Sequence, residues 1–293
     1  MLKLELHAHL SGSIDTEFLL ELAKSSPDLK LDNEEIRFLR NYGGCNLNEC
    51  FKLFGIIHKI LQKHHLIEKS IAHVIEKFTE DGVFYLELRS TLREMENSSK
   101  LDYLIMILQS INDHHLVQNG RILVNFLVSI DRARGVDCGH DSIEALKKCQ
   151  LLRPDIAKRI VGVDLSGNPH VGNLMEYASL LNSVRDLGLK TTVHFAEIED
   201  IHEEWLCFLL EHIPDRIGHA TALLTSSEDD SKKVSEVVAI VRERKIPIEA
   251  CLTSNIKCQS VLNYQDHHFH KWFQMLHPIF LCVSCYATVS ILI

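Results

Sequence analysis

Residues 4–9 read Leu4-Glu5-Leu6-His7-Ala8-His9, an apolar run that ends in two histidines. In a β-strand, residues two apart point to the same face, so both imidazoles can bind one metal ion. Two later apolar runs end in a similar way, one with His194 and Glu197 and the other with His219. This pattern is typical of zinc hydrolases in which separate strands of a barrel supply the metal ligands.

Apolar runs alternate with amphipathic stretches along the chain. The runs are rich in Val, Ile and Leu and nearly continuous, which is typical of parallel strands that are buried on both faces. We predict eight strands, at residues 2–9, 83–89, 122–131, 160–165, 189–195, 216–218, 246–251 and 279–283. Helical patterns lie between them, at residues 66–81, 101–115, 174–187, 203–212 and 232–244. The alternation predicts an α/β protein with a (β/α)8 TIM barrel of the metal-dependent hydrolase type, with extra helices between residues 16 and 79.

Length, charge and cysteine usage restrict the function further. A chain of 293 residues suffices for one barrel, so we expect a single domain over residues 1–293. The net charge of −9, without a basic stripe, argues against a nucleic-acid partner. Nine cysteines without regular spacing favour a reducing compartment, and we expect a cytoplasmic monomer. Residues 279–293 carry no charge, but they are fewer than the roughly 20 residues that cross a bilayer. We therefore interpret them as a divergent last strand and tail, and we expect no membrane partner.

Polar residues gather at the ends of the predicted strands. Active-site residues of barrel enzymes lie at the carboxyl ends of the strands, and burying them is costly unless they find partners. A single histidine there is most simply a hydrogen-bonded core residue. Four histidines, two of them in a His-x-His pair, favour a metal site instead. The residues at strand ends are His7, His9, Arg89, Asp131, Ser166, His194, Glu197 and His219.

Six motifs in this order resemble the adenosine deaminase family, and most closely its adenosine deaminase-like branch, the N6-methyl-AMP deaminases. They are KLELHAHL (3–10), YLELRST (85–91), VDLSGNP (163–169), HFAE (194–197), RIGH (216–219) and CLTSN (251–255). The resemblance implies a zinc-dependent barrel enzyme. Such an enzyme removes an amino or alkylamino group from C6 of a small-molecule purine nucleoside or nucleotide.

The resemblance also implies roles for individual residues. His7, His9 and His194 would bind one Zn2+ per chain, which lowers the pKa of its bound water from about 15.7 towards about 7. Glu197 would give a proton to purine N1, because the aromatic ring resists attack by water until a ring nitrogen is protonated. His219 would orient or deprotonate the water. The resemblance places the backbone N–H of Gly167 at purine N3.

Positions in this branch that line the nucleotide pocket correspond to a further set of residues. Among them we expect Arg93 to bind the phosphate, because a guanidinium fork matches phosphate oxygens. The full set implied for substrate binding is His9, Ser11, His58, Ser90, Thr91, Leu92, Arg93, Asp131 and Gly167.

Several of these residues also have a structural interpretation. His58 lies in a helical pattern and suits a helix interface, and Asp131 suits an ion pair with Arg132 in a loop. Arg89 and Glu87 suit a structural pair at the barrel mouth. Residues 253–255 are typical of a turn, and we assign them no chemistry.

The sequence departs from the family pattern at strand eight. The family has Thr-Asp-Asp after this strand; the first Asp completes the zinc site and the second accepts a hydrogen bond from purine N7. This chain has Val283-Ser284-Cys285 instead. We therefore expect a truncated form that lacks the helices after strand eight and has impaired activity. Milder departures are Ser11 for Asn, Leu92 for Pro and Ala220 for Gly.

Three alternative functions compete with this interpretation. A two-zinc hydrolase of the same superfamily usually has a bridging lysine at the end of strand four, where this chain has Asp164-Leu165-Ser166-Gly167, which favours one metal. A cytidine-type zinc deaminase has H-x-E with P-C-x-x-C; His202-Glu203-Glu204 and Cys282-Val283-Ser284-Cys285 imitate this, but the proline is absent. A nucleotide-binding pseudoenzyme without turnover is favoured by the missing aspartates.

Overall fold

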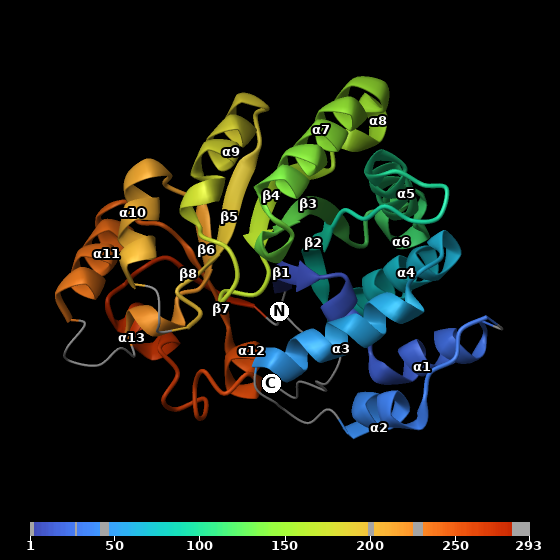
Figure 1. Cartoon of the computed structure of the whole chain (residues 1–293), viewed down its shortest axis with the longest axis horizontal. Helices are drawn as coiled ribbons and strands as arrows, with labels where there is room; N and C mark the ends of the chain where they lie inside the picture. The colour runs from blue at the N-terminus through green and yellow to red at the C-terminus, as the bar shows by residue number, and fades with distance from the viewer. Residues whose placement is uncertain (1–2, 27, 42–46, 199–201, 225–230, 283–293) are drawn as a thin grey trace.

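The computed structural model describes residues 3–26, 28–41, 47–198, 202–224 and 231–282, and its centre is a nearly closed barrel of eight parallel strands (Figure 1). Each strand pairs with the next one along the chain. The strands are β1 (Lys3–His9), β2 (Val83–Thr91), β3 (Leu123–Asp131), β4 (Ile160–Ser166), β5 (Lys190–Phe195), β6 (Arg216–His219), β7 (Ile248–Cys251) and β8 (Ile279–Cys282). The prediction of a (β/α)8 barrel is confirmed.

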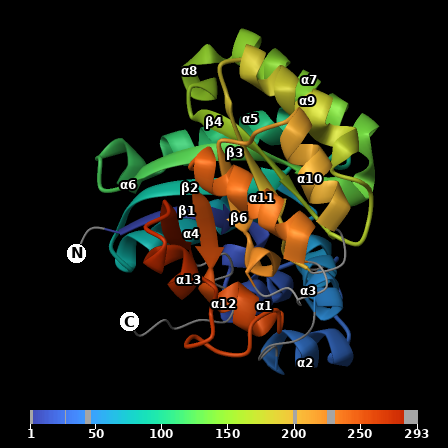
Figure 2. The same cartoon turned by 90° about the vertical axis from the view of Figure 1, so that its left-hand side faces the viewer.

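Helices cover the outside of the barrel (Figure 2). Those between β1 and β2 are α1 (Thr16–Lys24), α2 (Asn33–Asn41), α3 (Leu47–Ile60) and α4 (His64–Glu80), which confirms the predicted extra helices. The others are α5 (Lys100–Asp113), α6 (His115–Gln118), α7 (Val136–Leu152), α8 (Pro154–Ala157), α9 (Met175–Asp186), α10 (His202–Glu211), α11 (Ser231–Glu243), α12 (Leu252–Lys257) and α13 (Phe269–Gln274). No helix among the described residues is long and apolar enough to cross a membrane.

The main apolar core lies between the sheet and these helices. It includes Val74 of α4 and Leu86 of β2, two elements that contact one another, and both side chains are fully buried. Burying such apolar side chains stabilises a fold by about 1.5–3 kcal/mol each. The strand patterns were therefore readable in the sequence because one face of each strand packs against helices.

The inside of the barrel is unusual because it carries charged side chains. Residues two apart on one strand point inward together, as Glu87 and Arg89 do on β2. Barrel interiors are commonly filled by branched apolar residues. Here the buried charged side chains include Glu5, Glu87, Arg89, Asp164 and Glu249.

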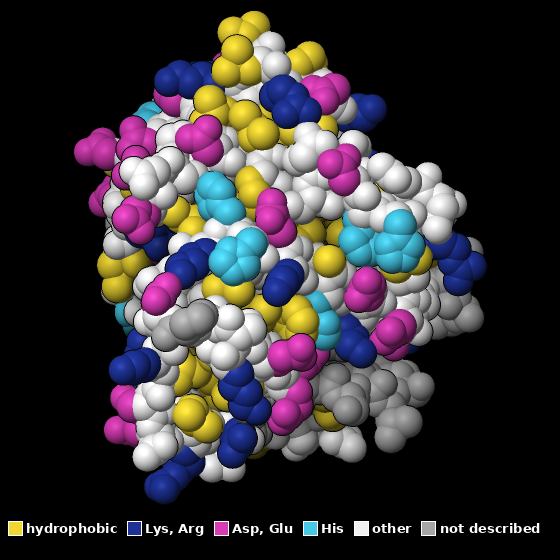
Figure 3. All heavy atoms as spheres, turned by 90° about the vertical axis from the view of Figure 1, so that its right-hand side faces the viewer, with side chains coloured by type: hydrophobic (Ala, Val, Ile, Leu, Met, Phe, Trp, Pro, Cys, Tyr) yellow, Lys and Arg dark blue, Asp and Glu magenta, His cyan; other side chains and the backbone are white. Residues whose placement is uncertain are grey.

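The two edge strands of the nearly closed barrel, β1 and β8, contact one another. Leu6 of β1, Cys251 of β7 and Cys282 of β8 form a second, small apolar cluster. Residues 283–293 lie outside the described residues. The expectations about the divergent tail and about the helices after strand eight concern this part of the chain and stay predictions. On the face drawn in Figure 3, basic and acidic side chains are interspersed.

Candidate metal centre and active site

Three imidazoles from opposite sides of the barrel meet at the carboxyl ends of the strands. His7 and His9 end β1, and His194 lies near the end of β5. The Nε2 atom of His194 lies 3.2 Å from Nε2 of His7 and 3.1 Å from Nε2 of His9. Ligands of a tetrahedral zinc ion with Zn–N bonds of 2.0–2.1 Å are about 3.3 Å apart. The donor set and its spacing therefore fit one divalent zinc ion.

In two of these histidines, His7 and His194, a buried carboxylate holds the other ring nitrogen, Nδ1. Nδ1 of His7 lies 2.6 Å from Oε2 of Glu249, and Nδ1 of His194 lies 3.1 Å from Oδ1 of Asp164. A carboxylate at Nδ1 keeps the ring proton there, so the Nε2 lone pair points at the shared position. Metal-bound histidines commonly have this arrangement. Neither Glu249 nor Asp164 was among the predicted site residues, although each lies buried on a predicted strand.

Arg89 links the two carboxylates. Its guanidinium donates to Asp164 and to Glu249, each at 3.1 Å, and also to the carbonyl oxygen of Leu6. The predicted pair of Arg89 with Glu87 is wrong. Glu87 lies one layer deeper in the barrel, where it accepts hydrogen bonds from Tyr85 and Arg216.

This environment controls the charge of the histidines. Burial, followed by the positive charge of Arg89, lowers the pKa of His7, and burial also lowers the pKa of His9. Burial acts in the same direction on His194, but Asp164 outweighs it and raises the pKa of His194. Burial would raise the pKa of Asp164, yet His194 and Arg89 hold it well below its usual value. His7 and His9 are therefore neutral at pH 7, the form that binds a metal.

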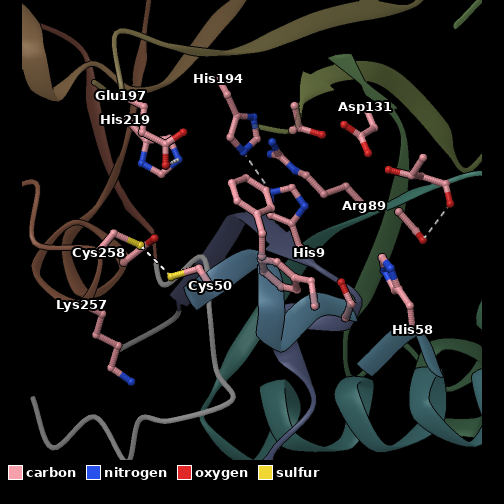
Figure 4. A pocket seen from close by; sticks show the side chains of 18 residues that line it. His9, Cys50, His58, Arg89, Asp131, His194, Glu197, His219, Lys257 and Cys258 are labelled. Atoms are coloured by element: carbon pink, nitrogen blue, oxygen red, sulfur yellow. Dashed lines mark hydrogen bonds and ion pairs between the residues drawn. The ribbon is translucent and has the colours of Figure 1, made fainter. Parts of the chain in front are cut away.

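Glu197, which follows β5, and His219, which ends β6, line the cavity beside these imidazoles (Figure 4). Oε1 of Glu197 lies 3.6 Å from Nε2 of His219. Ala196 has a φ of 50°, and this left-handed turn directs Glu197 into the cavity. His219 and Ala220 have φ values of 66° and 56°, a conformation that costs residues other than glycine some stability. Burial lowers the pKa of His219 to about 4.

Two further residues hold His219 in place. Nδ2 of Asn255 lies 3.1 Å from Nδ1 of His219, and Nε2 of His268 lies 2.8 Å from its carbonyl oxygen. Asn255 is buried and also contacts the Thr221 hydroxyl at 3.0 Å. Residues 253–255 were interpreted as a turn without chemistry. They form part of α12 instead, and Asn255 reaches the ring of a candidate catalytic residue.

A cavity lies over these residues; its empty volume, counted together with the solvent at its open mouth, is about 1140 Å3. Besides His194, Glu197 and His219, the predicted site residues that line it are His9, Ser11, His58, Ser90, Thr91, Asp131 and Gly167. The lining also includes side chains that the sequence analysis did not identify: Cys50, Phe51, Phe54, Ser254, Lys257 and Cys258. Phe51, Phe54 and His58 share one face of α3. Their spacing of three and four residues in the sequence could have predicted this shared face.

Two predicted substrate residues do not line the cavity. Leu92 is fully buried in the main core. Arg93 lies over the ring of Tyr103, 5.4 Å from its centroid, and donates to the Leu61 carbonyl oxygen at 3.3 Å. Asp131 does line the cavity, and it pairs with Arg134 at 3.4 Å rather than with the expected Arg132. Arg132 instead contacts Glu204 at 2.8 Å.

A second group of candidate metal ligands is buried beside the first. It consists of His7, His219 and Cys251, whose ligand atoms lie within 4.8 Å of one another. Because it shares His7 with the first group, the two groups are not independent sites.

Comparisons with known proteins agree with this geometry. The sequence model of the family described as adenosine deaminase matches residues 3–281. The chain is 36% identical to the N6-methyl-AMP deaminase of Bos taurus, with 96% of this chain and 78% of that protein covered. It is 38% identical to the N6-methyl-AMP deaminase of Danio rerio, with 96% and 79% covered. The crystal structure of Arabidopsis ADAL in complex with GMP superposes with a TM-score of 0.83 at 30% identity, covering 98% of this chain and 82% of that one.

Proposed function

Because this chain belongs to the adenosine deaminase family, it is a hydrolytic deaminase, and we propose that it acts at C6 of a purine nucleotide or nucleoside. The substrate would be N6-methyl-AMP, AMP or adenosine. The products would be IMP or inosine together with methylamine or ammonia. The observation that carries the proposal is the meeting of three imidazole Nε2 atoms beside Glu197 and His219.

We assign the metal role to His7, His9 and His194, which would hold one zinc ion. When bound, zinc lowers the pKa of a water molecule from about 15.7 towards about 7 and so supplies a nucleophile at neutral pH. The assignment is supported by the carboxylates at Nδ1 of His7 and His194, and by the lowered pKa values of His7 and His9.

The proposed catalytic residues move protons. Glu197 would protonate purine N1, which makes C6 electrophilic. His219 would accept a proton from the attacking water, since burial keeps its ring neutral at pH 7. The backbone N–H of Gly167 would donate to purine N3. Gly167 has a φ of 103°, and an added Cβ would lie 2.1 Å from Oδ1 of Asp131, so a side chain does not fit there.

The sugar and phosphate would lie towards His58, with Ser11, Ser90, Thr91 and Asp131 as further partners. Burial, together with smaller effects of the positive charges of Arg93 and Arg134, lowers the pKa of His58 to about 4. Both guanidinium groups therefore lie close enough to give this end of the cavity a positive potential, which favours a phosphate. We propose that Arg93 turns from Tyr103 to the phosphate, while Leu92 supports the wall from the core.

A direct test measures metal content and turnover together. The full chain should contain about one zinc per chain and release methylamine from N6-methyl-AMP or ammonia from AMP or adenosine. Glu197→Gln should abolish release while zinc content is unchanged. The control is Glu144→Gln, because Glu144 is exposed on α7, where it pairs with Lys147; release should be unchanged in this variant. Release by Glu197→Gln at the wild-type rate would remove Glu197 from the mechanism.

The second candidate function is a pseudoenzyme that binds the nucleotide without turnover. The sequence at residues 283–285, which contains neither family aspartate, favours it. Saturable IMP binding with no amine release from any of the three substrates would establish this alternative.

We also propose that residues 1–293 form one barrel domain that acts as a cytoplasmic monomer on small molecules, without nucleic-acid or membrane partners. The continuous pairing from β1 to β8 supports a single domain. A single species of monomer mass in light scattering would agree with the monomer, and a dimer mass would contradict it.

A further inference from the structure

Two thiols touch one another in the wall of the cavity. Cys50 lies on α3, and Cys258 directly follows α12, although the two are 208 positions apart in the sequence. Their Sγ atoms lie 3.2 Å apart (Figure 4). A disulfide bond needs a separation of about 2.05 Å, so the sulfur atoms would have to approach by only a little more than about 1 Å.

The two thiols differ in exposure. Cys50 is 7% exposed, whereas Cys258 is partly open to solvent. A dissolved reagent therefore reaches Cys258 first, and Cys50 is in place to react next. Such a pair, one accessible thiol with a second thiol in contact, is suited to forming an internal disulfide by exchange.

The position of the pair connects it to the cavity. On one side α3 contributes Phe51, Phe54 and His58 to the lining, and on the other side the α12 segment contributes Ser254 and Lys257. Cys50 and Cys258 lie where these two walls meet, and both line the cavity themselves. A bond between them would join the two walls.

We propose that Cys50 and Cys258 are a modification site at which a small disulfide, of the class of glutathione disulfide, is exchanged for a disulfide within the protein. The Cys258 thiolate attacks one sulfur of the small disulfide, and the first small thiol leaves with the proton that Cys258 lost. The Cys50 thiolate then attacks Sγ of Cys258, and the second small thiol leaves with the proton from Cys50. The protein loses two electrons and two protons, and the small disulfide gains them.

The consequence for activity rests on the proposed function. Both α3 and the α12 segment line the cavity that would bind the nucleotide, and a covalent bond between these walls would restrict their separation. We expect the oxidised protein to have a kcat/KM for its nucleotide that is lower by roughly fivefold or more, which corresponds to a modest coupling between two sites. Dithiothreitol should restore the original value.

The test compares the full-length wild type with Cys50→Ser, Cys258→Ser and a control, Cys207→Ser, whose thiol is exposed on α10. Each protein is incubated with glutathione disulfide, alkylated with iodoacetamide and digested for mass spectrometry. A peptide linking Cys50 to Cys258 should appear in the wild type and in Cys207→Ser. It should be absent from the other two variants, whose melting temperatures confirm that they are folded.

The linked peptide is measured without any reference to turnover, so it supports the modification site even if no amine is released. Wild type that becomes glutathionylated elsewhere, with no linked peptide, would overturn the site. If the linked peptide forms and the oxidised and reduced proteins turn over nucleotide equally, the restriction of the cavity is overturned. Absence of turnover in the reduced protein contradicts only the proposed function.

Discussion

At the residue scale, the site depends on balanced charges in the barrel interior. Glu249 receives contacts from His7, Arg89, Arg216 at 2.7 Å and Thr192 at 3.2 Å. An unpaired charge at such a buried position would cost several kcal/mol. Because each carboxylate oxygen of Glu249 has partners, its side chain is held in place and can orient the ring of His7. The charge network is therefore part of the proposed metal site and not a separate feature.

The hydrogen bonds of Asn255 indicate which way its side-chain amide is oriented next to His219. As placed, Nδ2 contacts His219, Thr221 and Ser260, while Oδ1 has no hydrogen-bond partner in the described part of the chain. The oxygen and nitrogen of an amide are distinguished only by their hydrogen bonds. The exchanged orientation lets Oδ1 accept the Nδ1 proton of His219, which leaves Nε2 of the ring able to accept a proton from water.

We predict that Asn255→Leu lowers kcat by about 10–100-fold, because the His219 ring loses the partner that orients it. KM and zinc content should not change. The control is Asn182→Leu, since Asn182 holds the remote His212 through the same kind of contact, at 2.7 Å. Steady-state kinetics with metal analysis provide the measurement. An unchanged kcat in Asn255→Leu would show that the contact does not orient His219 for catalysis.

His212 leads to a prediction about pH. Burial, with a smaller effect of Arg185, lowers its pKa to about 4, whereas the unfolded chain has a value near 6.5. Between these values the unfolded state binds a proton that the folded state does not, so stability falls as the pH falls from about 6.5 to about 4. Above about pH 6.5 this effect is absent. Urea unfolding at about pH 7.5 and about pH 5.5 should show a smaller loss for His212→Gln than for the wild type, and an equal loss would contradict the assignment.

At the element scale, the short strand β6 has to place His219 and also leave space for the ring of His7. Its last residue is His219, and Gly218 before it lies against the ring of His7. A Cβ atom at Gly218 would lie 2.9 Å from Cε1 of His7, so the added methyl group and the His7 ring could not both keep these positions. The strand therefore needs a glycine because a candidate metal ligand from β1 occupies the space.

We predict that Gly218→Ala displaces the ring of His7 and weakens zinc binding by about 10–100-fold. Gly55→Ala is the control, because a Cβ at this position on α3 meets nothing within 4 Å. That change should leave zinc binding unaltered and stabilise the helix by about 0.5–1 kcal/mol. Competition for zinc with a chromogenic chelator measures the affinity. Wild-type affinity in Gly218→Ala would show that the ring of His7 has room to move without losing the metal.

At the scale of the whole molecule, the proposed metal site depends on the arrangement of the strands in a nearly closed barrel. The ring nitrogens that meet come from β1 and β5, and the residues are 185 and 187 positions apart. A metal ion that binds only the folded state stabilises it in proportion to the logarithm of its concentration. The proposed zinc ion would thus connect strands on opposite sides of the barrel.

We predict that chelation lowers the melting temperature and that added zinc restores it. At a free zinc concentration 100 times the Kd, the stabilisation is about 2.7 kcal/mol. His194→Ala should remove the response to zinc, whereas His170→Ala, at an exposed position after β4, should keep it. Thermal unfolding followed by circular dichroism provides the measurement. A full response in His194→Ala would place the stabilising ion elsewhere.

The sequence by itself determined the strands and the positions of residues at their carboxyl ends. Apolar runs of strand length, separated by amphipathic helices, predicted all eight strands to within a few residues, because every strand must bury its side chains in the same way. Since parallel strands all end on one side of a barrel, the sequence alone predicts that His7, His9, His194, Glu197 and His219 lie at one site.

Only the tertiary structure decided which side chains meet. The partners of Arg89, the contact of Asn255 with His219, the inward position of Glu249 and the two adjacent thiols join residues from distant elements. Arg93 shows the same limit, because its guanidinium lies over Tyr103 instead of lining the cavity. Periodicity in the sequence reports which face of an element is buried. The direction and partner of one side chain depend instead on how remote elements pack against it.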